Sequence, residues 1–180
     1  MEEMQKMSVL LKSQEISNTL DRLASQIIEK HDSCENVILV GIERRGADLA
    51  RRLSKLVGKK IGSQVKLGTL DINLYRDDWT SIEGKPHIGQ SHIPEHLEDL
   101  IVILVDDVLF TGRTIRAALE AVLDYGRPKT VELMVLIDRG HRELPISANY
   151  VGRTISTKKN DHVDVHLSER DGTDIVIINT

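Results

Sequence analysis

The chain has 180 residues, a formal net charge of −4 and a single cysteine, Cys34. This length suits one domain that buries roughly 70% of its unfolded surface, so we expect residues 1–180 to form a single domain. The lone cysteine excludes an internal disulfide framework, and no run of about 18 apolar residues indicates a membrane span. Because the net charge is negative, any contact with nucleic acid requires a local basic patch. We expect a cytoplasmic protein without membrane association.

The predicted elements alternate between helices and strands. Ser13 is a potential cap for a helix whose apolar residues recur at helical spacing, at Ile16, Leu20, Leu23 and Ile27. The elements expected after it are a strand at 37–42, a helix at 47–56, strands at 65–75 and 101–105, a helix at 113–125 and a strand at 131–137. This alternation predicts an α/β fold with a central, mostly parallel sheet flanked by helices.

The C-terminal part of the chain has a different pattern. Val163, Val165 and Leu167 alternate with polar residues, as do Ile175 and Ile177 less strictly. Such alternation is typical of half-exposed strands, which we expect to form a small hood over the functional site of the domain.

The interval 77–98 is rich in glycine and proline, lacks periodicity and contains the only tryptophan, Trp79. Long connections of this kind are uncommon in compact domains unless they are functional or disordered, so the interval is predicted to be a lid, the alternative being an idle surface loop. It also contains His87, His92 and His96. We interpret these as solvated loop residues, because no cysteine accompanies them and their spacing matches no common zinc site.

The most informative segment runs from Ile101 to Thr114. An apolar run ends in two acids, Asp106 and Asp107, and continues into the turn Thr111-Gly112-Arg113-Thr114. Ligands bind at the carboxyl ends of parallel strands, where carboxylates can accept hydrogen bonds from sugar hydroxyls. The turn and the start of the next helix offer hydroxyls and backbone N–H groups to an anion. The segment therefore predicts a sugar-phosphate site.

A second anion site is predicted at Glu43–Gly46, directly after a strand. Arg44 and Arg45 provide two cations there, and the glycine allows a close turn of the backbone, which suits pyrophosphate. The alternative is an exposed basic turn. Ala47-Asp48 occupies the place where a nucleotide P-loop requires Lys-Ser/Thr, which argues against an NTPase.

The segment Val102–Thr114 resembles the phosphoribosyl-pyrophosphate signature of the type I phosphoribosyltransferases. Further runs narrow the likeness, namely Gly41–Gly46, Leu74–Asp78, Gly126–Pro128 and Asp138–Pro145. Together they resemble the bacterial pyrimidine operon attenuation regulators, which are also uracil phosphoribosyltransferases. The similarity extends from about Leu20 to the C-terminus.

The resemblance implies the reaction of uracil with 5-phosphoribosyl 1-pyrophosphate (PRPP) to give UMP and diphosphate. It implies Mg²⁺ held mainly through PRPP, with no residue assigned as a metal ligand. The catalytic residues would be Asp106, Asp107 and Arg76. No general base is identified, and Asp107 is no more than a candidate for it. The residues expected to bind PRPP or nucleotide are Arg44, Arg45, Asp106, Asp107, Val108, Leu109, Phe110, Thr111, Gly112, Arg113 and Thr114. The base would be bound near Asp138, Arg139 and His141, with its edges contacted by backbone groups.

The resemblance also implies binding of pyr operon leader mRNA, strengthened by UMP or UTP, and a homodimer or higher oligomer. The expected RNA-binding residues are Arg142, Arg153 and Lys158. The chain departs from the family pattern at Ser147, where many members carry arginine, and at Asp21, whose carboxylate would repel phosphate. Two alternatives stay open, a purine salvage phosphoribosyltransferase and a uracil phosphoribosyltransferase with lost or weakened RNA binding.

Overall fold

The computed structural model describes residues 7–77, 89–93 and 96–180. Its elements are β1 (Met7–Lys12), α1 (Ser13–His31), β2 (Val37–Ile42), α2 (Arg45–Ile61), β3 (Lys66–Leu70), the 3-10 turn η1 (Asn73–Tyr75), β4 (Ile101–Leu109), α3 (Arg113–Leu123), β5 (Thr130–Asp138), β6 (Tyr150–Thr154), β7 (His162–His166), α4 (Ser168–Asp171) and β8 (Ile175–Asn179). Within these described ranges, no helix has the length and apolar character needed to cross a membrane.

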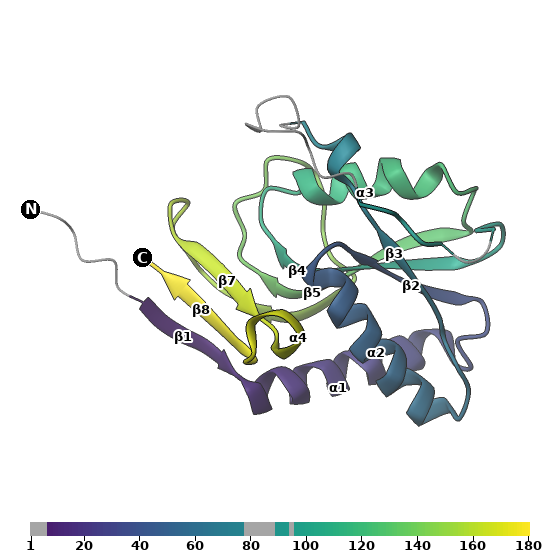
Figure 1. Cartoon of the computed structure of the whole chain (residues 1–180), viewed down its shortest axis with the longest axis horizontal. Coiled ribbons are helices and arrows are strands. Elements are labelled where there is room, and N and C mark those ends of the chain that lie inside the picture. The colour runs from purple at the N-terminus through teal and green to yellow at the C-terminus, as the bar shows by residue number, and fades with distance from the viewer. Residues whose placement is uncertain (1–6, 78–88, 94–95) are drawn as a thin grey trace, which may run out of the picture.

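Five parallel strands form the main sheet, in the order β3-β2-β4-β5-β6. Helices α1 and α2 cover one face of this sheet and α3 covers the other (Figure 1). The α/β fold with a central parallel sheet is therefore confirmed. Because β4 lies in the middle, its carboxyl end is flanked by the loops that follow β2 and β5.

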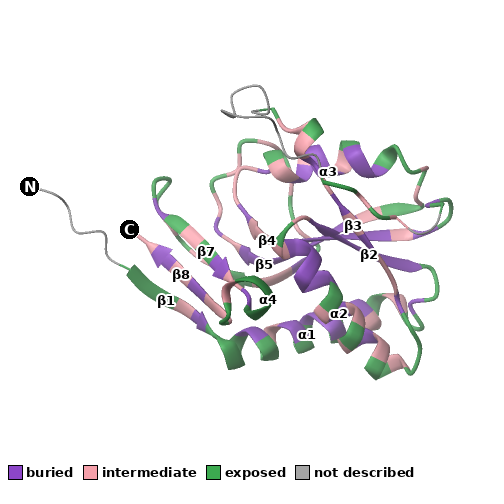
Figure 2. Cartoon of the chain, in the orientation of Figure 1, coloured by how far each residue is buried: buried purple, intermediate pink, exposed green. Residues whose placement is uncertain are grey.

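Strand β4 is apolar throughout its first half because both of its faces are covered. Ile103 and Val105 pack with the residues of α1 and α2, whereas Val102 and Leu104 pack with those of α3. All four side chains are fully buried (Figure 2). Strands buried on both faces are near-continuous apolar runs, which is why this strand was recognisable from the sequence.

The hood is a separate antiparallel sheet of three strands in the order β1-β8-β7, with α4 between β7 and β8. Its inner face carries Leu11, Val165 and Val176 into the core beside α1 and α2. The half-exposed C-terminal strands were expected, but the sequence reading left out β1 and the edge strand β6. Figure 1 shows the hood at one end of the molecule, beyond the main sheet.

Several element boundaries differ from the expected ones. Strand β3 stops at Leu70 instead of running to Tyr75, because the Asp71 carboxylate accepts the backbone N–H of Asn73 (2.8 Å) and turns the chain. Helix α1 starts with Ser13 inside the helix, so the expected Ser13 cap was wrong by one residue and Lys12 is the N-cap.

Most of the expected lid, including Trp79 and His87, lies outside the described residues. At its far end, His92 pairs with Thr69 through two backbone hydrogen bonds of 2.8 and 2.9 Å, next to the edge strand β3. His96 is exposed.

Candidate active site

The two neighbouring acids lie near the carboxyl end of β4. Asp106 is 7% exposed and Asp107 is half-buried. Each carboxylate accepts the next backbone N–H, with Asp107 N to Asp106 Oδ1 at 3.0 Å and Val108 N to Asp107 Oδ1 at 2.8 Å. These bonds fix both side chains near the carboxyl end of the central strand.

Burial raises the pKa of both carboxyls. For Asp106 the charge of Asp107 raises the pKa further, whereas for Asp107 the Val108 N–H and the Arg45 guanidinium oppose the rise. Two carboxylates this close share their protons as a pair. Each carboxylate can accept further hydrogen bonds besides its backbone N–H, and the hydroxyls of a bound ribose would donate them.

The turn after β4 forms an anion cradle. Gly112 has a φ of 92°, in the left-handed region that favours glycine, and it leads directly into α3. The Thr111 carbonyl accepts the backbone N–H groups of Glu143 (2.9 Å) and Leu144 (3.2 Å), which ties the turn to the loop after β5. The N-cap residue Gly112 has no side chain, and the Arg113 N–H donates to Thr111 Oγ1 at 3.3 Å, so the other N–H groups of the first turn of α3 can bind an anion.

Arg113 lies at the rim of this cradle between two carboxylates. Its Nε donates to Glu143 Oε2 and its Nη1 to Asp77 Oδ2, both at 2.8 Å. A cavity of about 270 Å³ opens here, lined by Arg76, Asp77, Phe110, Thr111, Arg113 and Thr114. A phosphate in the cavity would compete with both carboxylates for the Arg113 guanidinium.

The loop Glu43–Gly46, here called the pyrophosphate loop after the ligand that the sequence predicts for it, packs against β4 beside the acids. A Cβ atom on Gly46 would lie 2.3 Å from the Val105 carbonyl oxygen, so only glycine allows this approach. The Glu43–Arg44 peptide bond is cis. The Arg44 side chain is exposed and Arg45 is half-buried. The structure thus brings the two predicted anion sites to the same edge of the sheet.

Two of the expected base-binding residues, Arg139 and His141, contact the ring of Phe110. The Arg139 guanidinium stacks over the Phe110 ring at 4.1 Å, and the His141 ring contacts it edge-on with 6.2 Å between centroids. Arg139 Nη2 donates to the Lys158 carbonyl (2.9 Å) and His141 Nε2 to that of Thr157 (2.6 Å). These side chains brace the loop. That backbone groups of this loop contact the base stays a prediction.

Asp138 and Arg142 hold the same loop to the segment that follows β4, at Phe110. Asp138 Oδ2 accepts Arg142 Nη2 at 2.6 Å, while Arg142 Nη1 donates to the Phe110 carbonyl at 2.9 Å. Arg142 therefore has internal partners on several sides. Of the other residues expected to bind RNA, Arg153 on β6 donates to the Leu10 carbonyl of β1 (2.7 Å), and Lys158 is exposed.

Among the described residues, no group of three or more His, Cys, Asp or Glu side chains is placed to hold a metal ion. The two acids of β4 offer hard oxygen atoms at one edge. Mg²⁺ commonly keeps several waters and takes oxygens from one or two carboxylates and from substrate phosphates. The donor set therefore fits Mg²⁺ that arrives with a phosphorylated substrate.

Two residues of the hood were missed by the sequence reading. Asp171 Oδ1 accepts Arg45 Nη2 at 3.1 Å, and the Arg170 guanidinium pairs with Asp48 and lies 3.6 Å from Glu43. They contact the pyrophosphate loop across more than 120 positions of sequence. In the sequence they belong to a polar turn between two strands, and nothing there indicates their partners.

Residues 7–170 match the family model of the phosphoribosyl transferase domain. The chain belongs to the phosphoribosyltransferase family. Curated relatives named "Bifunctional protein PyrR" align over nearly their whole length. The protein from Alkaliphilus metalliredigens is 53% identical and that from Desulfosudis oleivorans is 50% identical, covering 94% and 99% of this chain and 93% and 99% of the relative, respectively.

Solved phosphoribosyltransferase structures share the fold at low sequence identity. The hypoxanthine phosphoribosyltransferase of Trypanosoma cruzi superposes with a TM-score of 0.71 at 15% identity over 95% of both chains. The hypoxanthine phosphoribosyltransferase of Staphylococcus aureus gives a TM-score of 0.67 at 22% identity and covers 94% of this chain and 90% of its own. At these identities the likeness concerns the fold, not the choice of base.

Proposed function

We propose that this phosphoribosyltransferase is a bifunctional regulator of pyrimidine biosynthesis. It converts uracil and PRPP to UMP and diphosphate. It also binds pyr operon leader mRNA in a manner that depends on UMP or UTP and promotes transcription attenuation. We further propose that it acts in the cytoplasm as a homodimer or higher oligomer.

One observation supports the catalytic part above others. Asp106 and Asp107, the start of α3 and the pyrophosphate loop lie together at the carboxyl ends of β2 and β4. PRPP has an anionic group at each end of a ribose with vicinal hydroxyls. These groups offer donors for the two anionic ends and acceptors for the hydroxyls between them. The relatives named "Bifunctional protein PyrR", at about half identity over almost the entire chain, support the same assignment.

The chemistry requires charge stabilisation. As the bond from ribose C1 to pyrophosphate lengthens, positive charge grows on the sugar and negative charge on the leaving group. Asp106 and Asp107 would orient the ribose and stabilise the cationic sugar. Arg44, Arg45 and Arg76 would neutralise the leaving pyrophosphate, and the Thr111–Thr114 turn would hold the 5′-phosphate. Catalysis would therefore depend on positioning and electrostatics.

Mg²⁺ would be held mainly by oxygens of PRPP, with Asp106 and Asp107 orienting the ribose hydroxyls that contribute to its coordination. When bound, it supplies positive charge to the pyrophosphate. The protein's own residues account for the orientation of the substrate.

The RNA-binding part rests on linkage between two ligands. If UMP in the catalytic pocket favours one arrangement of the protein and RNA binds that arrangement better, each ligand tightens the other by the same factor. The carboxylate of Asp21 on α1 was expected to repel RNA phosphates, but it pairs with Lys60 of α2 at 2.9 Å. This ion pair reduces the repulsion of phosphate expected from the Asp21 carboxylate.

Pyrophosphate release from PRPP and Mg²⁺, measured with uracil, hypoxanthine, guanine and adenine in turn, tests the enzymatic assignment. We expect turnover with uracil and rates near background with the three purines. Preference for a purine would replace the assignment with the purine salvage alternative.

A gel-shift titration against the organism's own pyr leader, with and without UMP, tests the regulatory part. We expect retardation at submicromolar protein and a tighter complex with UMP. No retardation at micromolar protein would reject RNA binding and leave a uracil phosphoribosyltransferase without this second activity.

A further inference from the structure

The hood contacts the pyrophosphate loop through two adjacent residues of α4. Arg170 pairs with Asp48, whose side chain is only 4% exposed, and donates from Nη2 to the Arg44 carbonyl at 3.3 Å. Asp171 accepts Arg45 Nη2 at 3.1 Å on one carboxylate oxygen and 3.4 Å on the other. The hood therefore contacts both the backbone of the loop and one of its two arginine side chains.

The Arg45 guanidinium is only partly satisfied by these contacts. Its Nε is buried and has no hydrogen-bond partner within the described part of the chain. The guanidinium also attracts the Asp107 carboxylate, which partly offsets the effect of burial that raises the pKa of this acid. Arg45 thus lies between the hood and the acids of β4 with a buried donor that has no acceptor. Buried donors are nearly always paired, so this Nε is a candidate donor for a bound anion.

We propose that Asp171 is a positioning residue, which holds the Arg45 guanidinium so that its remaining donors face the pyrophosphate group of the substrate. Asp171 acts through Arg45 and itself contacts no substrate. This inference rests on the proposed phosphoribosyl transfer, but it is independent of the identity of the base and of RNA binding. It assigns the hood a role in holding the leaving group, in addition to covering the site.

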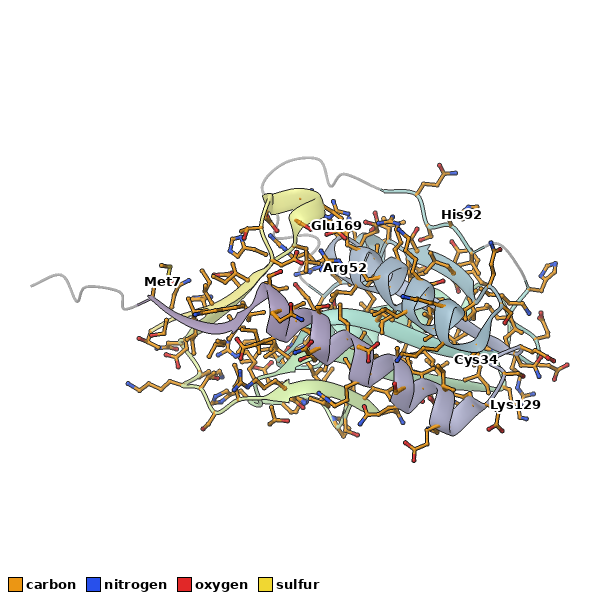
Figure 3. All side chains as sticks on the ribbon, turned by 90° about the horizontal axis from the view of Figure 1, so that it is seen from below. Met7, Cys34, Arg52, His92, Lys129 and Glu169 are labelled. Atoms are coloured by element: carbon orange, nitrogen blue, oxygen red, sulfur yellow. The ribbon has the colours of Figure 1, made fainter. Side chains whose placement is uncertain are left out.

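The same hood offers a matched control. Arg52 of α2 donates from Nε to Glu169 Oε1 and from Nη1 to Asp174 Oδ2, both at 2.8 Å. In Figure 3, Arg52 and Glu169 lie close together where α2 meets the hood. This contact also joins the hood to α2, but it does not involve Arg45. A variant at Glu169 therefore weakens hood attachment and leaves the Asp171–Arg45 contact in place.

Calorimetric titration of inorganic pyrophosphate with Mg²⁺, together with steady-state kinetics, tests the proposal on Asp171→Asn and Glu169→Gln. The asparagine retains an oxygen that can accept the Leu167 N–H, which Asp171 Oδ2 accepts at 2.8 Å. We expect Asp171→Asn to weaken pyrophosphate binding and raise the KM for PRPP by about fivefold or more, with the KM for uracil unchanged. Glu169→Gln should leave all three values within twofold of wild type.

A double variant separates positioning from general electrostatics. If Asp171 acts through Arg45, adding Asp171→Asn to Arg45→Gln should cause little further loss of pyrophosphate affinity. Equal or tighter pyrophosphate binding by Asp171→Asn would overturn the proposal, because it would mean that the carboxylate only repels or competes with the ligand. Additive losses in the double variant would overturn it as well.

Two further outcomes are distinguishable. If wild-type protein neither binds pyrophosphate nor turns over PRPP with any base, the proposed function fails together with this inference. If Asp171→Asn melts well below Glu169→Gln, Arg45→Gln alone tests the arrangement from the loop side. Unchanged pyrophosphate affinity in that variant would contradict the proposal.

Discussion

At the scale of single residues, Asp106 and Asp107 carry both the proposed chemistry and a cost in stability. They are adjacent carboxyls at the edge of a buried strand, and burial raises the pKa of each. Acids in this environment are unfavourable for folding in their charged form, so their presence is better explained by ligand binding than by stability.

Asp107→Asn should retain the fold and lower turnover. The amide cannot supply the negative charge that we assign to stabilising the sugar, so kcat should fall by at least about tenfold, equivalent to ~1.4 kcal/mol. Steady-state pyrophosphate release measures this loss, with circular dichroism as the check on folding. A folded variant with rates within twofold of wild type would reject the role.

The same substitution should stabilise the protein at neutral pH. A carboxyl whose pKa is raised in the folded state favours folding when protonated, and its contribution is lost as the pH rises through the folded pKa. Asp107→Asn should thus be more stable than wild type at pH 8, and the gain should vanish below about pH 4, where both states of wild type bind the proton. Urea unfolding at several pH values tests this. A gain that grows towards acidic pH would contradict it.

At the scale of elements, the start of α2 sets the position of the pyrophosphate loop. Gly46 lets the loop approach β4 so closely that an added Cβ would contact the Val105 carbonyl at 2.3 Å and the Asp106 Cα at 3.2 Å. Both contacts are with backbone, which cannot move away as a flexible side chain could. The loop and the acids are therefore held in one arrangement.

Gly46→Ala should displace the loop from the acids, destabilise the fold by about 1–3 kcal/mol and raise the KM for PRPP. Gly62→Ala is the matched control, since Gly62 at the other end of α2 also disfavours a side chain, through its positive φ of 73°, but has no atom within 4 Å of an added Cβ. Denaturation and steady-state kinetics compare the two. Wild-type KM values in a stably folded Gly46→Ala variant would contradict this account.

The sequence predicted the central elements and missed those with weak local patterns. Strand β4 was recognisable because its apolar run and paired acids are specified locally, and the turn at Gly112 follows the same logic. Strand β1 was missed because it is a largely exposed edge strand that gains its partner β8 from the far end of the chain.

The site shows the same division. Predicting that Asp106, Asp107 and the pyrophosphate loop come together required only the rule that carboxyl ends of parallel strands share an edge. The contacts of Asp171 with Arg45, and of Arg142 with the Phe110 carbonyl, depend on tertiary packing between distant segments. No spacing in the sequence indicates them. The assignment of each residue to substrate or RNA stays a prediction.

At the scale of the whole molecule, the carboxyl ends and the amino ends of the parallel strands differ in character. The candidate active site lies at the carboxyl ends of the strands. Near their amino ends, a polar cluster joins α1, β5 and β6. Glu132, 7% exposed, accepts the Tyr150 hydroxyl at 2.6 Å, contacts His31 Nε2 at 3.0 Å and pairs with Lys30 at 2.7 Å. Burial opposes ionisation of Glu132, but these three partners outweigh it and lower its pKa.

Glu132→Ala should destabilise the protein by about 1–3 kcal/mol, because the Tyr150 hydroxyl and the His31 imidazole lose their shared acceptor and keep only their 3.1 Å contact with each other. Since the pKa is lowered in the folded state, the contribution of Glu132 is present above its unfolded value of about 4.3 and is lost as the pH falls. At a temperature well below melting, kcat/KM should stay within twofold of wild type. A large loss of activity with unchanged stability would contradict this separation of the two ends of the strands.

A crystal structure with PRPP and Mg²⁺ tests the central claim most directly. We predict that the ribose hydroxyls lie against Asp106 and Asp107, the 5′-phosphate in the Thr111–Thr114 turn and the pyrophosphate at the Glu43–Gly46 loop. PRPP bound at another edge of the sheet, or both acids turned away from the ribose, would contradict the account.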